Sequence, residues 1–462
     1  MFTEGTGSLD KLDVFLDEIW NKRDKTVLSF WGQEDKETSQ RFINFSRKPG
    51  HVNLKSRNYV GVINFDGNVY NLLPKIFNDG QELDNDKLVS IQAHILWWLS
   101  YCHKFKFPKS YSSFNFKKAN FFEVLIYLFA SYTKDVLNNT IYQAYEEVHE
   151  DLNFMKGRLD FNTYITKNYV SGNHHKLSCI YSSFEMDNTF NRIVKYVVKL
   201  LLQYTSELDN KKNLQQILFI LDEVKDIQVT IFDTEKVHIN PLYEDMFTVL
   251  DYCKLFLSNS MVLSYNNQLK VFAFLLPMEY VFEDFIYGFI KKELKDIVVK
   301  AQAGKTKLTE EGLFSLRPDL VIKVKGTSTG AKTKNIIADT KYKMIYPEGD
   351  DPKYGISEKD MYQMLTYAVR NKADEIKLLY PNTVQQLQQK NNIQFSIKDE
   401  FTEKTKITIN AYQLPVIANN WSSIGKDESL NRSFSDVRDK LKKKLEKILS
   451  VTESNTKSTT TE

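Results

Sequence analysis

The spacing of apolar residues changes twice along the chain, and these changes limit its fold more than any other feature. Residues 25–77 contain short β-branched and aromatic runs separated by glycine-containing turns, a pattern typical of strands. From about residue 83 to 263, apolar residues recur at three- and four-residue spacing, which is typical of helices. From about 268 to 449, the two patterns alternate. The chain is therefore predicted to be a multi-domain α/β protein.

The length of 462 residues is enough for two or three domains. Asp66-Gly67 lies between two strand-like runs and predicts a hairpin there, whereas residues 146–165 are predicted to be rich in loops. The predicted segments are a β-rich N-terminal domain (1–82), a helical middle region (83–267), a C-terminal domain with a mixed sheet flanked by helices (268–450) and a disordered polar tail (451–462).

Composition excludes several classes of protein. The cysteines Cys102, Cys179 and Cys253 are too far apart in sequence for a disulfide framework or a zinc motif. No apolar run is long enough to cross a bilayer, and the first residues lack the pattern of a signal peptide, so a cytoplasmic protein is expected. The net charge of +3 means that a nucleic-acid partner would need a local basic patch.

Two acidic residues and a lysine stand at the ends of two strand-like runs. Asp319 and Asp339 are each ten residues from Thr329, so a symmetric hairpin would place them opposite each other, with Cβ atoms roughly 5 Å apart if they share a face. Asp339 and Lys341 share a strand face because side chains alternate. Two close carboxylates predict a cation between them, and an all-oxygen set suits Mg²⁺. The alternative is a surface hairpin with charged ends.

Two helical segments flank these strands in sequence. Residues 277–294 carry an apolar stripe with Glu283 at its edge, where it is either a third carboxylate of the site or a solvated side chain. In residues 357–371, Ser357 and Asp360 predict a capping box. Gln363 and Tyr367 lie off the predicted buried stripe and either face a bound strand or form plain surface. That stripe is Met361, Met364, Leu365, Ala368 and Val369.

This order of motifs resembles the PD-(D/E)xK nuclease fold. The signature is Pro318-Asp319 followed by Asp339-Thr340-Lys341, with Glu283 on the preceding helix and Gln363 on the following one. Upstream, NYVGVINFDGNVYNLLPKIF, FMKGRLDF and FEMDNTFNRIVKYVV resemble successive landmarks of the McrC family, the nuclease subunits of McrBC-type modification-dependent (5-methylcytosine) restriction systems. The chain departs from that family in a long loop between the motif strands and in an extended helical segment, 199–263.

The resemblance implies a β-rich N-terminal region, a helical middle and a C-terminal PD-(D/E)xK endonuclease domain at 268–450. It implies that Asp319, Asp339 and Lys341 are catalytic, together with Glu283 and Gln363, and that Asp319, Asp339 and Glu283 bind Mg²⁺ or Mn²⁺.

Partners also follow from the resemblance, which implies double-stranded DNA, including modified DNA, and a separate McrB-like AAA+ GTPase oligomer. The chain has no Walker A motif of its own, because the loop GTSTGAKTK lacks the required spacing. The expected function is a Mg²⁺-dependent endonuclease subunit that cleaves DNA when coupled to this motor and stimulates it, with the middle region as the docking surface. Two alternatives remain: a non-catalytic adaptor that activates the motor, and a stand-alone repair-type nuclease.

Overall fold

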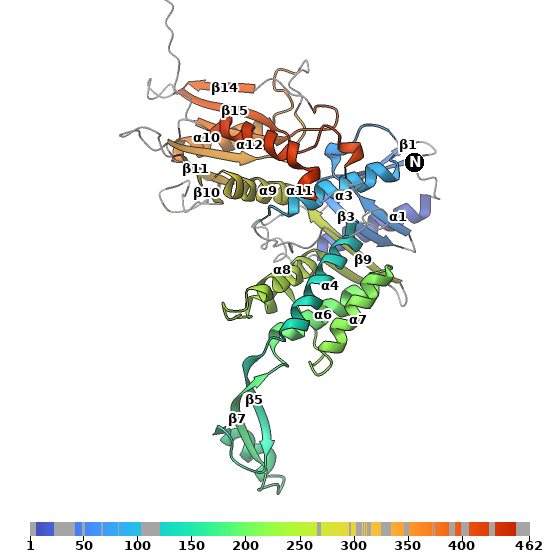
Figure 1. Ribbon diagram of the computed structural model, residues 1–462, viewed down its shortest axis with the longest axis vertical. Helices are drawn as coiled ribbons and strands as arrows, with labels where there is room; N and C mark the ends of the chain where they lie inside the picture. The colour runs from blue at the N-terminus through green and yellow to red at the C-terminus, as the bar shows by residue number, and fades with distance from the viewer. Residues whose placement is uncertain are drawn as a thin grey trace, which may run out of the picture. The chain divides into compact units, whose positions relative to one another are not determined.

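The structure is a computed structural model, shown in Figure 1. The described residues are 6–22, 42–48, 51–65, 68–81, 83–102, 121–265, 269–294, 297–301, 307, 309, 311, 316–324, 334–345, 351–371, 373, 375–387, 393–398, 406–424 and 430–449. The predicted tail at 451–462 and the strand-like run at 26–31 lie outside them.

The chain forms two compact units. One, here called the discontinuous unit, comprises Met1–Phe121 and Met261–Glu462; the other, the inserted unit, comprises Phe122–Ser260. These boundaries differ from the domain limits predicted at 82/83 and 267/268. The reason is that both ends of the sequence contribute to one core.

The N-terminal part of the discontinuous unit is mainly β. Strands β3 and β4 form the hairpin predicted around Asp66-Gly67, and β3 also pairs with β9 in the sheet β4-β3-β9-β8. Gly61 in β3 has φ +150°, and a Cβ atom there would lie 1.9 Å from the carbonyl oxygen of Phe274, so only glycine allows this approach. The elements are α1 (Thr6–Lys22), β1 (Ile43–Lys48), β2 (His51–Ser56), β3 (Tyr59–Phe65), β4 (Asn68–Leu72), η1 (Lys75–Phe77), β8 (Ser260–Tyr265) and β9 (Leu269–Pro277).

An aromatic cluster joins the N-terminal and C-terminal parts of the discontinuous unit. Helix α3 (Asn85–Leu99) is capped by Asp84, whose carboxylate accepts a hydrogen bond from Lys87 N. In α3, Trp97 stacks on Phe434, with ring centroids 4.8 Å apart, and meets Phe285 of α9 (Met278–Glu293) edge-on at 5.2 Å. Aromatic pairs of this kind bury much apolar area, so α3 belongs to the core of the discontinuous unit.

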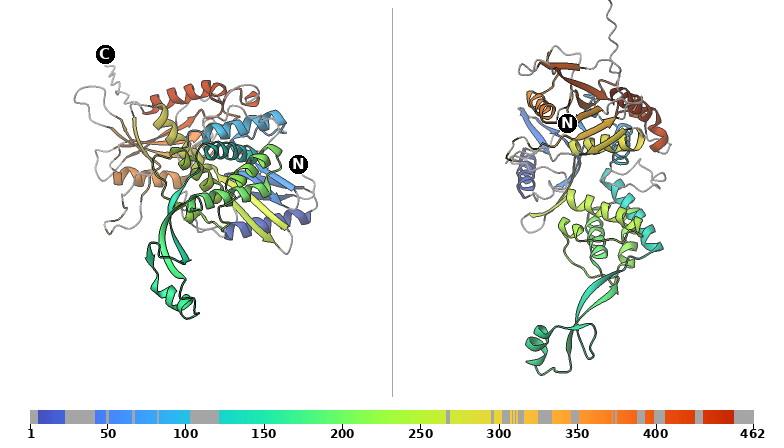
Figure 2. Two further views of the ribbon diagram at one scale, coloured as in Figure 1. Left: turned by 60° about the horizontal axis from the view of Figure 1, so that its bottom comes forward. Right: turned by 90° about the vertical axis from the view of Figure 1, so that its left-hand side faces the viewer.

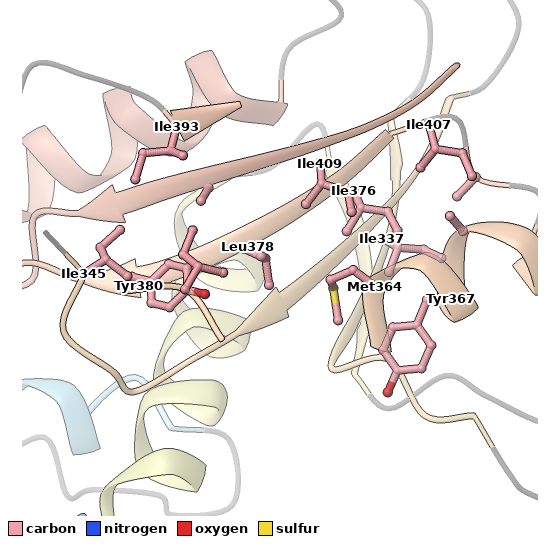
Figure 3. Close-up of a cluster of buried hydrophobic side chains, with 14 residues drawn as sticks. Ile337, Ile345, Met364, Tyr367, Ile376, Leu378, Tyr380, Ile393, Ile407 and Ile409 are labelled. Atoms are coloured by element: carbon pink, nitrogen blue, oxygen red, sulfur yellow. The ribbon is translucent and has the colours of Figure 1, made fainter. Parts of the chain in front are cut away.

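A six-stranded sheet occupies the C-terminal part of this unit. Its order is β10-β11-β12-β13-β15-β14, with β12, β13 and β15 parallel and the other pairs antiparallel. Helix α10 covers one face, where Met364 and Tyr367 pack against Ile337 and Ile376 (Figure 3); α9 and α12 lie on the other face (Figure 2). The bounds are β10 (Ile297–Ala301), β11 (Leu320–Val324), β12 (Lys334–Thr340), α10 (Glu358–Asn371), β13 (Glu375–Pro381), β14 (Ile393–Lys398), β15 (Lys406–Leu414), η5 (Trp421–Ser423), α11 (Leu430–Ser433) and α12 (Ser435–Leu449).

The inserted unit is a helical bundle with a β arm. Its helices are α4 (Phe121–Asn139), α5 (Phe161–Thr163), η3 (Tyr164–Tyr169), α6 (Thr189–Tyr204), α7 (Leu208–Ile220), η4 (Ile231–Glu235) and α8 (Glu244–Asn259). Buried Glu123 fixes α4 to the α6–α7 turn, because its carboxylate accepts from Thr205 Oγ1, Ser206 N and Asn210 Nδ2.

The prediction of loops at 146–165 was wrong. Strand β5 (Ala144–Leu152) pairs along its whole length with β7 (Leu177–Glu185), and β6 (Arg158–Leu159) joins β7. The arm (residues 144–185) extends from the helices of the inserted unit in Figure 1. Most residues of β5 are at least partly exposed, so the strand lacks the apolar alternation that marks a half-buried strand.

Candidate functional site

The pairing of β11 with β12 brings the two motif aspartates together. Leu320 pairs with Ala338, so Asp319, directly before β11, lies opposite Asp339. Thr340 donates to Asp319 Oδ2 from its backbone nitrogen at 2.7 Å and from Oγ1 at 2.8 Å. The antiparallel register expected from the symmetric hairpin is therefore observed, while residues 325–333 of its loop lie outside the described residues.

Asp339 is fully buried, and its two carboxylate oxygens differ in environment. Neither oxygen has a hydrogen-bond partner among the described residues, but Oδ2 forms an ion pair with Lys341 Nζ at 2.5 Å. Burial raises the pKa of Asp339 to about 7, and neighbouring Asp319 adds to the rise. An unsatisfied buried carboxylate oxygen costs free energy, so an additional ligand for Oδ1 is expected.

Asp319 and Lys341 each affect the pKa of the other. Burial raises the pKa of half-buried Asp319 to about 7, and Glu283 acts in the same direction while Lys341 opposes it. Burial alone would lower the pKa of Lys341, but Asp339 and Asp319 raise it above its usual range. The carboxylates thus outnumber the lysine, as in a site that takes up a further cation.

Gln363 and Tyr367 hold the lysine from helix α10. Lys341 Nζ donates to Gln363 Oε1 at 3.1 Å, Gln363 Nε2 donates to the Tyr367 hydroxyl at 2.8 Å, and that hydroxyl donates to the Arg317 carbonyl at 2.9 Å. Tyr367 is buried and Val369 is 60% exposed, which corrects the predicted stripe of α10. The buried face of α10 therefore differs from the predicted stripe, because Gln363 and Tyr367 bond to groups at the strand ends.

Asp360 belongs to this region, and sequence reasoning gave it only a capping role. The capping contact is present, because the backbone nitrogen of Asp360 donates a hydrogen bond to Ser357 Oγ at 3.2 Å. Its buried carboxylate, however, accepts two hydrogen bonds from Lys343 Nζ, both 2.9 Å long, and raises the pKa of Asp339. The spacing of three residues between Asp360 and Gln363, which puts them on one helix face, was the available signal.

The fit of a metal rests on the two aspartates. Mg²⁺ is commonly held by one or two carboxylates plus water and substrate oxygens, and the unpartnered Asp339 Oδ1 beside Asp319 suits that arrangement. Glu283 is half-buried on α9 and close enough to raise the pKa of Asp319. Within the described ranges, no three His, Cys, Asp or Glu side chains form a metal-binding group, so ligation by Glu283 stays a prediction.

The fold and the site define an α/β protein with two aspartates and a lysine at one end of a mixed sheet. The chain belongs to the family described as McrBC 5-methylcytosine restriction system component, which matches residues 54–381. The family resemblance predicted from the sequence is thus confirmed. No curated protein matches the chain.

Two solved structures match the chain, and the first of them shares its fold. A chain of the refined half-complex from the tetradecameric assembly of Thermococcus gammatolerans McrB AAA+ hexamers with bound McrC has a TM-score of 0.60 at 20% identity, with 97% of this chain and 96% of that chain covered. A chain of the cryo-EM structure of the Thermococcus gammatolerans McrBC complex has a TM-score of 0.44 at 22% identity, with 62% and 81% covered. No helix among the described residues is both long and apolar enough to span a membrane.

Proposed function

We propose that this chain is the Mg²⁺-dependent DNA endonuclease subunit of a McrBC-like restriction system, with its active site at the end of β12 in a PD-(D/E)xK fold. The observation that carries the proposal is the buried Asp339: neither of its carboxylate oxygens has a hydrogen-bond partner among the described residues, and Oδ2 forms an ion pair with Lys341 at 2.5 Å. A buried carboxylate without hydrogen bonds, next to a second aspartate, costs free energy. Such groups are rare in folded proteins and cluster at functional sites.

Each residue of the site has a distinct role in this proposal. Asp319 and Asp339 hold Mg²⁺ or Mn²⁺, and such an ion, when bound, polarises a phosphate and lowers the pKa of a bound water. Lys341, held by Gln363, orients the attacking water or stabilises negative charge on the phosphate. Thr340 keeps Asp319 in place through two hydrogen bonds to one oxygen.

The partner in this proposal is a McrB-like AAA+ GTPase oligomer. The fold is shared with a solved assembly described as McrB AAA+ hexamers with bound McrC. The arm of the inserted unit offers a surface for such a partner, because Phe154, Met155 and Phe161 near its end are each more than 60% exposed. Clustered exposed apolar side chains are typical of protein interaction sites.

The test is plasmid cleavage by the full chain with its motor partner, Mg²⁺ and GTP. We expect Asp339→Ala and Lys341→Ala to abolish cleavage, and EDTA to abolish it in the wild type. The matched control is Asp436→Ala, which removes an exposed aspartate 2.7 Å from Lys440 on α12. Circular dichroism checks the fold. If both site variants cleave at the wild-type rate, the assignment is refuted. If the wild-type chain stimulates GTP hydrolysis by the motor but cuts no DNA, the chain is an adaptor.

A further inference from the structure

Lys75 lies beside the candidate site, although it is far from it in sequence. It begins η1, directly after Pro74. Its Nζ atom lies 5.3 Å from the centroid of the Tyr342 ring, and Tyr342 stands between Lys341 and Lys343 in the chain. The fold therefore carries a lysine of the N-terminal segment to the end of β12, within the same compact unit.

The partners of Lys75 are a ring and an amide rather than a carboxylate. Its Nζ donates to Asn58 Oδ1 at 2.7 Å, and Asn58 Nδ2 in turn donates to Glu279 Oε1 at 2.5 Å. No carboxylate lies within ion-pair distance of Lys75 in the part of the chain that the structure describes. A half-buried cation without such a counter-charge is disfavoured unless an anion joins it.

The surrounding charges increase the demand for an anion. Burial lowers the pKa of Lys75 to about 8; Glu279 opposes this change, whereas Lys343 and Lys55 add to it. Lys343 is already paired with Asp360 at 2.9 Å, and Lys55 is exposed. Positive charge thus converges from β2, η1 and the end of β12.

We propose that Lys75 binds a backbone phosphate of the DNA substrate next to the scissile one, with Lys343 and Lys55 lining the same path. This inference rests on the proposed nuclease function and deepens it. The Tyr342 ring and Asn58 hold the ammonium in one place, so little side-chain entropy remains to be lost on binding. Glu279 acts on Lys75 from behind Asn58, so a phosphate would supply the counter-charge in direct contact that the ammonium lacks.

The experiment measures DNA binding separately from cleavage. The full chain is titrated onto a short fluorescent DNA duplex in EDTA at increasing NaCl concentration. Lys75→Gln keeps a donor for Asn58 but removes the charge. We expect roughly 5- to 10-fold weaker binding at low salt and a slope of log K against log[salt] that is smaller by about 0.9, the value for one phosphate contact. Lys75→Arg should keep the wild-type slope.

Lys87 provides the matched control. Its Nζ lies over the Trp421 ring at 5.9 Å, much as Lys75 lies over Tyr342, but it is paired with Asp79 at 2.9 Å. Lys87→Gln should therefore leave the slope unchanged. An unchanged slope in Lys75→Gln, or an equal fall in Lys87→Gln, would overturn the inference, with thermal melts showing that each variant is folded.

The outcomes also separate this inference from the proposed function. If the wild-type chain cuts plasmid and Lys75→Gln binds DNA as the wild type does, only the phosphate site is wrong. If the wild type binds no DNA at low salt and cuts none with its partner, both proposals are wrong. If Lys75→Gln does not fold, Lys75→Met gives the same loss of charge, and a wild-type slope in that variant would equally overturn the inference.

Discussion

Asp339 shows how a buried residue of the candidate site can oppose the stability of its own fold. Its folded pKa is about 7, above the ordinary value of 3.8, so the folded state favours the protonated form. The ionised carboxylate therefore costs stability as the pH rises from about 4, and the whole cost is present above about pH 7. Asparagine at this position carries no such charge.

We predict that Asp339→Asn is more stable than the wild type at pH 8 by about 1–3 kcal/mol in EDTA, with a gain that shrinks as the pH falls toward 4. One pKa unit corresponds to about 1.4 kcal/mol, which sets the scale. Urea unfolding at several pH values measures the difference. Asp436→Asn, at an exposed position, should show no comparable trend. A gain that does not change with pH would contradict this account.

Sequence patterns identified some residues of the candidate site and its surroundings and missed others, for physical reasons. Asp319 and Asp339 were found because hairpin symmetry fixes which residues face each other, and the register agrees. Lys75 was missed because its neighbours, Asn58 and Tyr342, are 17 and 267 positions away, and no local pattern encodes such contacts. Asp360 was missed because a cap and an ion pair use the same residue type.

At the scale of elements, α10 links the site to the sheet through two polar contacts. Gln363 bonds to Lys341, and Asp360 bonds to Lys343, so one helix face holds both ends of the segment after β12. The helix itself was predictable from its apolar spacing, but its rotation was not. Tyr367 is buried because its hydroxyl bonds to the Arg317 carbonyl, which periodicity cannot reveal.

We predict that Asp360→Asn lowers the cleavage rate about 10- to 100-fold, because loss of the Lys343 pair loosens the segment that carries Lys341; small displacements have effects of this size. Glu358→Gln is the matched control on the same helix, since it breaks the exposed Lys353–Glu358 pair of 2.6 Å, and exposed pairs contribute little. Single-turnover cleavage and thermal midpoints are measured together. Equal rates in both variants would show that Asp360 serves only as a cap.

At the scale of the whole molecule, the discontinuous unit decides which truncations make sense. Strand β9 pairs with β3, and α9 packs on α3, so a fragment of residues 268–450 loses partners for two of its elements. The inserted unit is continuous in sequence. Its helices were predictable from their periodicity, whereas the arm was not, because its strands bury neither face well.

We predict that the 268–450 fragment shows no cooperative unfolding.

Replacing residues 145–184 by a short Gly-Ser linker, in contrast, should leave a folded chain. Ala144 and Glu185 pair directly, so a short linker can join them. This variant should keep DNA binding but fail to raise the GTP hydrolysis of the motor partner. Leu208→Ser, at an 80% exposed apolar position on α7, is the control. Full stimulation by the variant without the arm would place the docking surface elsewhere.

The interrupted course of the chain through the discontinuous unit also orders events at the ribosome. Domains commonly fold as their sequence emerges. The inserted unit is complete once Ser260 has left the exit tunnel, but β3 must wait for β9, and Asp319 and Asp339 arrive later still. A nascent chain therefore carries no assembled candidate site until β12 has emerged, and a chain whose synthesis stops before β12 lacks that site.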